Sequence, residues 1–107
     1  MLPIIVAEAP MLEQHIPRVL VRIVQSSASY KAHRQDSGAF TLLRLEHDGF
    51  PPITLGTVRS QARAERMLDW WVLNDRRVQR SLQLTALNQP TETIIDLLIE
   101  AARTCQD

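Results

Sequence analysis

The sequence predicts a small α+β protein that forms one domain over residues 1–107. A length of 107 residues suits a single domain with a core of its own, and 45% apolar with 22% charged residues is an ordinary globular balance. Short alternating segments separated by Asp-Gly and Pro-Pro turns predict an antiparallel meander. Segments with apolar residues at helical spacing lie on both sides of this meander and predict packed helices.

Apolar residues recur at helical spacing over residues 10–25, which predicts an N-terminal amphipathic helix. They are Leu12, Ile16, Val19, Leu20, Ile23 and Val24. Pro17 requires this helix to begin near it or to be kinked there, because proline removes one backbone hydrogen bond. A strand is the alternative for residues 18–25, since Val19, Val21 and Ile23 are β-branched.

A three-stranded antiparallel meander is expected over residues 28–34, 39–47 and 53–58. The first turn contains Asp36 and Gly38, and the second contains Asp-Gly and Pro-Pro between residues 47 and 52. These residues are typical of turns, and proline stops a strand from continuing through the connection.

A central helix is expected from Ser60 to about Asn74, because the Ser60 hydroxyl can cap the first turn. Residues 78–87 are open to two interpretations. The alternation of Leu82, Leu84 and Ala86 suits a fourth strand, but a continued helix through residue 87 is equally consistent with the pattern.

A C-terminal helix follows the Asn-Gln-Pro-Thr segment at residues 88–91. Its main buried stripe is predicted to comprise Ile94, Leu97, Leu98, Ala101 and Cys105, and the arc is widened by Ile95, Ile99 and Ala102. So wide an apolar face needs cover from a sheet, another helix or a second subunit, so a homodimer is one possible outcome.

Composition excludes several function classes. Cys105 is the single cysteine, and His15, His33 and His47 are not at metal-ligand spacing, so neither a disulfide nor a metal site is predicted. No phosphate-binding loop or serine nucleophile motif is present, so we expect no cofactor and no enzymatic activity. The N-terminus lacks a basic leader or a membrane-span pattern, which favours a cytoplasmic location without membrane association.

The strongest functional signal is the expected central helix, which carries arginines and two adjacent tryptophans. Trp71 falls on the apolar face with Ala64, Met67 and Leu68, whereas Trp70 lies at its edge. Arginine beside tryptophan is typical of a protein–protein hot spot. We therefore predict a non-enzymatic interaction module, such as an adaptor, chaperone-like binder or inhibitor, that contacts a protein partner through Arg63, Arg66, Met67, Trp70 and Arg77. The alternative is that the arginine stems and a wide core cover both rings.

Charge supports a second hypothesis, a module that binds nucleic-acid phosphates. Its candidate residues are Arg59, Arg63, Arg66, Arg76, Arg77 and Arg80. The expected helix, meander and basic helix start are similar to the double-stranded-RNA-binding domain, and residues 59–63 resemble that family's Lys-Lys-x-Ala-Lys motif in register. Ser60 stands in place of a lysine, and twelve basic residues balance twelve acidic ones. The acidic C-terminal segment makes internal pairing with these arginines equally compatible with the sequence.

Overall fold

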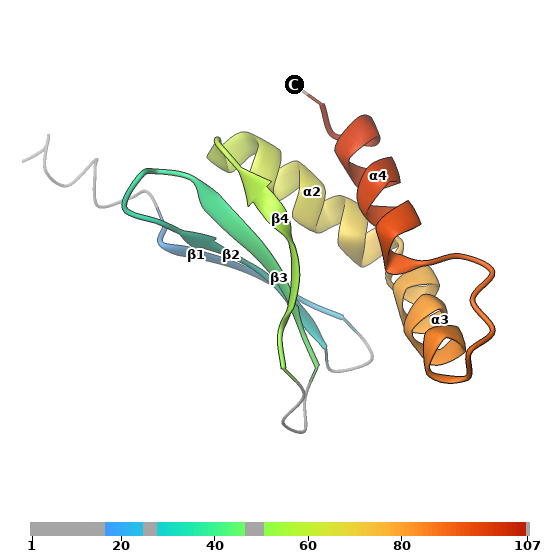
Figure 1. The fold of residues 1–107 in the computed structure, drawn as a ribbon. Helices are drawn as coiled ribbons and strands as arrows, with labels where there is room; N and C mark the ends of the chain where they lie inside the picture. The colour runs from blue at the N-terminus through green and yellow to red at the C-terminus, as the bar shows by residue number, and fades with distance from the viewer. Residues whose placement is uncertain (1–16, 25–27, 47–50, 107) are drawn as a thin grey trace, which may run out of the picture.

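A computed structural model describes residues 17–24, 28–46 and 51–106 of the chain. These residues form an α+β fold, as predicted, with one antiparallel sheet in the order β1-β2-β3-β4 and helices that follow it (Figure 1). The strands are β1 (Val19–Ile23), β2 (Ser29–Arg34), β3 (Phe40–Leu45) and β4 (Ile53–Val58). The helices are α2 (Gln61–Leu73), α3 (Asp75–Ala86) and α4 (Ile94–Thr104).

The meander of β2, β3 and β4 is confirmed, and its register places alternate side chains on opposite faces. Tyr30 lies opposite Arg44, and Ala32 lies opposite Leu42, with all four side chains buried on the same face. The β2–β3 turn closes with a 2.8 Å hydrogen bond from the amide of Gln35 to the carbonyl of Ala39. Gly38 has a φ of 90° in this turn, a conformation that favours glycine.

A β-bulge interrupts the pairing of β3 with β4. Leu42 lies opposite Gly56 and Leu43 lies opposite Thr54, which leaves Leu55 as the extra residue. Gly56 accommodates the bulge with a φ of 133°. Leu55 and Val58 are both buried, so the bulge keeps β4 attached to the core on the side of the sheet that faces the helices.

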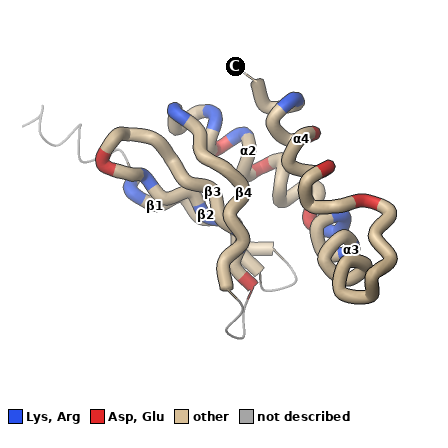
Figure 2. The backbone as a smooth tube through the Cα atoms, viewed as in Figure 1, with Lys and Arg blue, Asp and Glu red and all other residues tan. Residues whose placement is uncertain are grey.

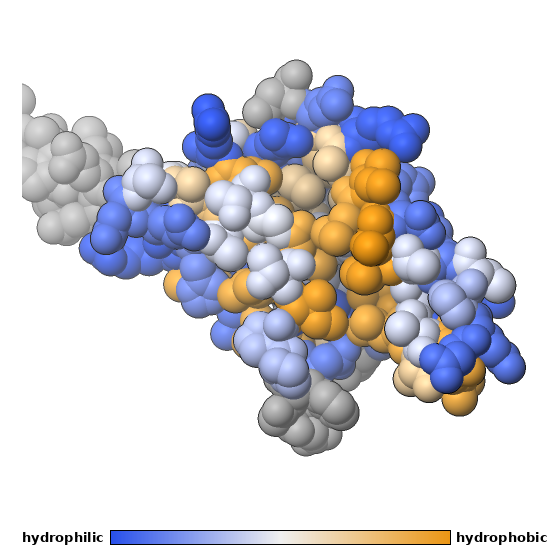
Figure 3. Space-filling view, viewed as in Figure 1, coloured by the Kyte–Doolittle hydropathy of each residue, from blue (hydrophilic) through white to orange (hydrophobic). Residues whose placement is uncertain are grey.

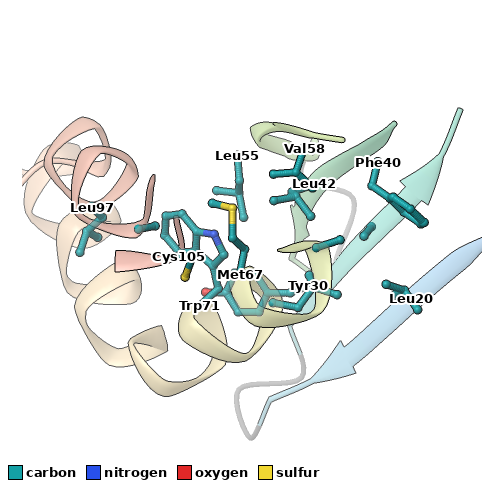
Figure 4. Close-up of a cluster of buried hydrophobic side chains, with 14 of the residues drawn as sticks. Leu20, Tyr30, Phe40, Leu42, Leu55, Val58, Met67, Trp71, Leu97 and Cys105 are labelled. Atoms are coloured by element: carbon teal, nitrogen blue, oxygen red, sulfur yellow. The ribbon is translucent and has the colours of Figure 1, made fainter. Parts of the chain in front are cut away.

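Helix α2 covers one face of the sheet, and the opposite face carries no helix of the described chain (Figure 1). The predicted Ser60 cap is confirmed, because its hydroxyl accepts a 3.1 Å hydrogen bond from the amide of Arg63. Trp71 lies fully buried in the core between the sheet and α4, close to Met67, Leu55 and Leu97 (Figure 4).

Helix α4 returns across α2 and α3 and buries the predicted stripe. Leu97, Ala101 and Cys105 are buried, and Ile94 and Leu98 pack against the core. Its first turn is held by a reciprocal capping box between Thr93 and Asp96. The widening residues Ile95, Ile99 and Ala102 remain exposed on the described chain.

One assignment made from the sequence is wrong, and one segment that it left open is assigned by the structure. Residues 19–23 form strand β1 instead of the end of an N-terminal helix, because β-branched side chains pair with the free edge of β2. The other part of that expected helix, residues 10–16, lies outside the described residues. The helix–meander–helix order that resembled the RNA-binding family is therefore not found in the described chain.

Residues 82–86 were open to strand or helix, and they lie in α3, which confirms the helix alternative and not the fourth strand. Val78, Ser81 and Leu82 recur at helical spacing, and Val78 and Ser81 are buried while Leu82 packs against the core. The sheet does have four strands, but β1 supplies the additional one.

We predict that Leu97→Ala lowers the free energy of unfolding by about 2–5 kcal/mol, because the lost side chain leaves a cavity between α4 and α2. Ile95→Ala is a matched control on the same helix, with a side chain that is 62% exposed, and should cost less than about 1 kcal/mol. Urea denaturation measures both values. Equal losses would contradict the described packing of α4.

Candidate functional site

The predicted Arg/Trp face comprises Arg63, Arg66, Met67 and Trp70 on α2 and Arg77 on α3, and both helices contact α4 of the same chain. Arg63 donates from Nε to the backbone carbonyl of Cys105 at 3.1 Å, at the C-terminal end of α4. Met67 is only 5% exposed, so it belongs to the core and not to an open surface. Arg66 is exposed, and its backbone carbonyl lies 3.9 Å from the Cys105 thiol.

Trp70 is half-buried at the edge of this face. Its ring meets Trp71 edge to face at a centroid distance of 5.1 Å, and the Arg77 guanidinium lies over it at 6.0 Å. Arg77 also donates to the Glu92 carboxylate at 2.6 Å and pairs with Glu100 of α4. The Arg77 guanidinium and the core therefore cover part of Trp70, which stays partly exposed.

Charge pairing holds α3 to the loop before α4 and to α4 itself. Hydrogen bonds from Arg77 hold the pKa of Glu92 below its usual value. The Arg77 guanidinium also donates a 3.0 Å hydrogen bond to the side chain of Asn74, the residue between α2 and α3. The structure therefore shows Arg77 paired with the acidic C-terminal segment of its own chain. Whether the Arg/Trp face binds a partner stays a prediction, since α4 already occupies much of it.

The six arginines proposed for phosphate binding form two groups. Arg59, Arg63 and Arg66 lie at the start of α2, whereas Arg76, Arg77 and Arg80 lie on α3. The 13 residues of α2 span about 20 Å, so Arg59 at one end lies about that far from the start of α3, with Arg63 and Arg66 between. One short stretch of phosphates therefore does not face all six.

Sequence reasoning missed a buried polar network beneath α3. The Arg44 side chain has no solvent exposure, although it lies on a strand. Its guanidinium donates to Asp75 at 3.1 Å and to the Tyr30 hydroxyl at 3.0 Å, and it pairs with Glu46. Tyr30 in turn donates to Asp75 at 2.6 Å. The available sequence signal was the position of Arg44 two residues after Leu42, in the inward phase of β3.

Burial raises the pKa of the Tyr30 phenol well above its usual range, and the hydrogen bond to Asp75 adds to this rise. Burial also raises the pKa of the Cys105 thiol. A raised thiol pKa opposes formation of the reactive thiolate, so Cys105 does not have the environment of a catalytic nucleophile.

An apolar trough, defined here by the hollow between the start of β4 and α3, adjoins the free edge of the sheet. The hollow has a volume of about 420 Å³ and is lined by Glu46, Pro51, Ile53, Leu82, Gln83 and Ala86. Figure 3 shows hydrophobic surface over α4 and in the space between α4 and β4. On α4, Ile95 and Ile99 are 62% and 50% exposed.

A larger hollow of about 570 Å³ lies between the end of β1 and the junction of α2 with α3. Its lining mixes exposed Ile23 and Leu73 with Asp75, Arg76 and Gln79. The described residues include no group of three His, Cys, Asp or Glu side chains that could hold a metal ion. No helix among residues 17–106 that the structure describes has the length and apolar character needed to cross a membrane.

Alkaline titration should detect the buried network. Tyr30 is the single tyrosine, so phenolate absorbance reports on it alone. Its folded-state pKa lies above the unfolded value of about 10, so its contribution to stability is present below that pH and is lost as pH rises through the folded value. We expect phenolate formation to coincide with unfolding followed by circular dichroism. A midpoint near 10 in a folded protein would contradict the network.

Arg77→Ala should lower the free energy of unfolding by about 1 kcal/mol, because partly exposed ion pairs are weakened by solvent. Arg76→Ala removes the same charge from the neighbouring exposed position and serves as the control. The pKa of Glu92 is lower in the folded protein than in the unfolded chain. The Arg77–Glu92 pair therefore stabilises the fold above the unfolded-state pKa of Glu92, and this stabilisation is lost as the pH falls through the folded-state pKa. Urea denaturation at neutral and acidic pH should show this loss, and a pH-independent difference would contradict it.

Comparisons of the chain with protein-family models, with curated proteins and with solved structures each find no match. A function for this chain therefore has to be argued from its own geometry.

Proposed function

We propose that this chain is a small, non-enzymatic protein-interaction module whose partner docks on the apolar trough and the adjoining flank of α4. The observation that carries the proposal is the exposure of Ile95 and Ile99 on a helix whose opposite flank is already packed. Burying such side chains against a partner is favourable by about 25 cal/mol for each Å² of apolar surface removed from water.

The orientation of α4 supports this surface. Glu100 faces Arg77 of α3, whereas Ile95, Ile99 and Ala102 occupy a different side of the helix. They form an apolar stripe at i, i+4 and i+7, the spacing by which one helix face contacts a partner. The contacts with α2 bury Leu97 and Ala101 on another side of α4 and leave this apolar stripe exposed.

The edge of β4 offers a second element of recognition. β4 pairs with β3 on one side, and no described strand pairs with its other side. Unpaired backbone groups on such an edge can accept an extended segment of a partner. The strand contains no charged residue, so an added strand meets no charge repulsion from β4.

The proposal differs from the Arg/Trp surface expected from the sequence, because Arg63 and Arg77 of that surface already contact Cys105 and Glu100 of the same chain. The partner class is unchanged: an adaptor, chaperone-like or inhibitory role remains the proposed type of function. The raised pKa of the Cys105 thiol supports a binding role over nucleophilic catalysis by this residue.

A double variant, Ile95→Lys and Ile99→Lys, tests the proposal by placing two charges on the exposed stripe. Affinity capture from the source cell with quantitative mass spectrometry should show at least one protein retained by the wild type and lost from this variant. Sedimentation of the purified protein would show in parallel whether a second copy is the partner. Thermal unfolding checks that the variant remains folded.

The matched control is Ile23→Lys with Leu73→Lys, which adds the same charge at two exposed residues of the larger hollow. This control should retain the partner. If it loses the partner while the α4 variant keeps it, the docking surface lies at the β1–α2 side. If all three proteins retain the same set, the exposed stripe of α4 is not an interaction surface and the proposal is wrong.

A further inference from the structure

Three arginines lie along one end of the sheet, although they are distant in sequence. The amide of Arg34 donates to the carbonyl of Arg18 at 2.7 Å, which places these residues side by side at the ends of β1 and β2. Arg34 lies opposite Phe40 in β3, and Phe40 lies opposite Val58 in β4. Arg59 directly follows Val58, so the row extends across all four strands.

These arginines differ from Arg22, Arg44 and Arg77, which form ion pairs within the described residues. Arg22 pairs with Asp69, Arg44 with Asp75, and Arg77 with its two glutamates. By contrast, no ion pair joins Arg18, Arg34 or Arg59 to an acid within the described ranges. Arg18 and Arg59 are exposed, and Arg34 is partly exposed. Their charges are therefore available to a ligand.

The start of α2 adds positive charge to the same end of the molecule (Figure 2). Residues 18, 34–38 and 59–66 at this end carry five arginines, with Arg63 and Arg66 added to the first three, and two acids, Asp36 and Glu65. Five less two gives a local surplus of three positive charges in a chain whose formal net charge is zero. The charge is thus concentrated by folding and not by overall composition.

The spacing of the row suits a line of phosphates. Adjacent strands lie about 4.8 Å apart, so β1 and β4 are separated by about 14 Å. One strand of a duplex carries a phosphate about every 3.4 Å along its axis, so this width corresponds to about four phosphates. A hollow of about 240 Å³ between Arg18 and Arg34 is lined further by Gln35, Asp36 and Gly38.

We propose that this end of the sheet binds the phosphate backbone of double-stranded nucleic acid, with Arg18, Arg34 and Arg59 as the contacting residues. Guanidinium groups donate to phosphate oxygens in bidentate geometry, which favours arginine at each position. Such contacts read the backbone and not the base sequence. The inference does not rest on the apolar trough, which involves other residues.

The experiment measures fluorescence anisotropy of a labelled duplex of mixed sequence during titration with the full chain at about 50 and 200 mM salt. Each phosphate neutralised contributes about −0.9 to the slope of log K against log salt, so three contacts predict a slope of about −2.7 and an affinity loss of about 40-fold over this range. Arg18→Ala with Arg59→Ala should reduce the magnitude of the slope by about 1.8.

Arg76→Ala with Arg80→Ala is the matched control, because both residues are exposed on α3 and their removal changes the net charge equally. This variant should bind as the wild type does. Equal weakening of both variants, or absence of binding at low salt, would overturn the proposal. Titrations with polyglutamate and with anionic phosphatidylserine vesicles test other polyanions, and binding to either one without the duplex would also overturn it.

Discussion

The burial of the Arg44 guanidinium is the constraint on which the arrangement of the helices depends. A charge without solvent contact requires partners, since leaving it unpaired in a protein interior costs several kcal/mol. Asp75 and Tyr30 meet that requirement, and Asp75 is the first residue of α3. The network therefore attaches the start of α3 to the middle of the sheet and ends α2 at Asn74. The direction of α3 follows from this attachment.

The position of α3 in turn directs the return of α4. Arg77, one half-turn after Asp75, engages Glu92 and Glu100, while Arg63 engages the carbonyl of Cys105 at the other end. These polar contacts border the apolar seam of Leu97 and Ala101 and set the register in which α4 crosses α2. Polar pairs of this kind contribute modestly to stability, but they favour one packing arrangement among several that would bury the same leucines. The chain thus uses its most conspicuous surface residues to hold its own last helix.

This use of the Arg/Trp face leaves surfaces elsewhere, and they differ in chemistry. Apolar side chains are exposed on α4 and line the hollow between β4 and α3, whereas Arg18, Arg34 and Arg59, which form no ion pair within the described ranges, lie at the end of the sheet where α2 begins. The residues that define the two surfaces are different, so a partner protein and a polyanion would not compete for the same side chains. One surface is apolar and the other is charged, so salt should affect binding at them differently. Ionic screening weakens the charge contacts and leaves hydrophobic contacts largely intact.

Local sequence determined much of the fold. Alternation and turn residues were enough to predict β2, β3 and β4, and Ser60 marked the start of α2, because these signals act within a few neighbouring residues. The buried stripe of α4 was likewise readable from its spacing. Only tertiary structure decided that residues 19–23 form a strand, because the free edge of β2 selects an extended conformation from a segment compatible with either. The same holds for Arg44 and Arg77, whose roles depend on Asp75 and on two glutamates far away in sequence. Periodicity records which face of an element is apolar, but the identity of what covers that face is set by long-range packing.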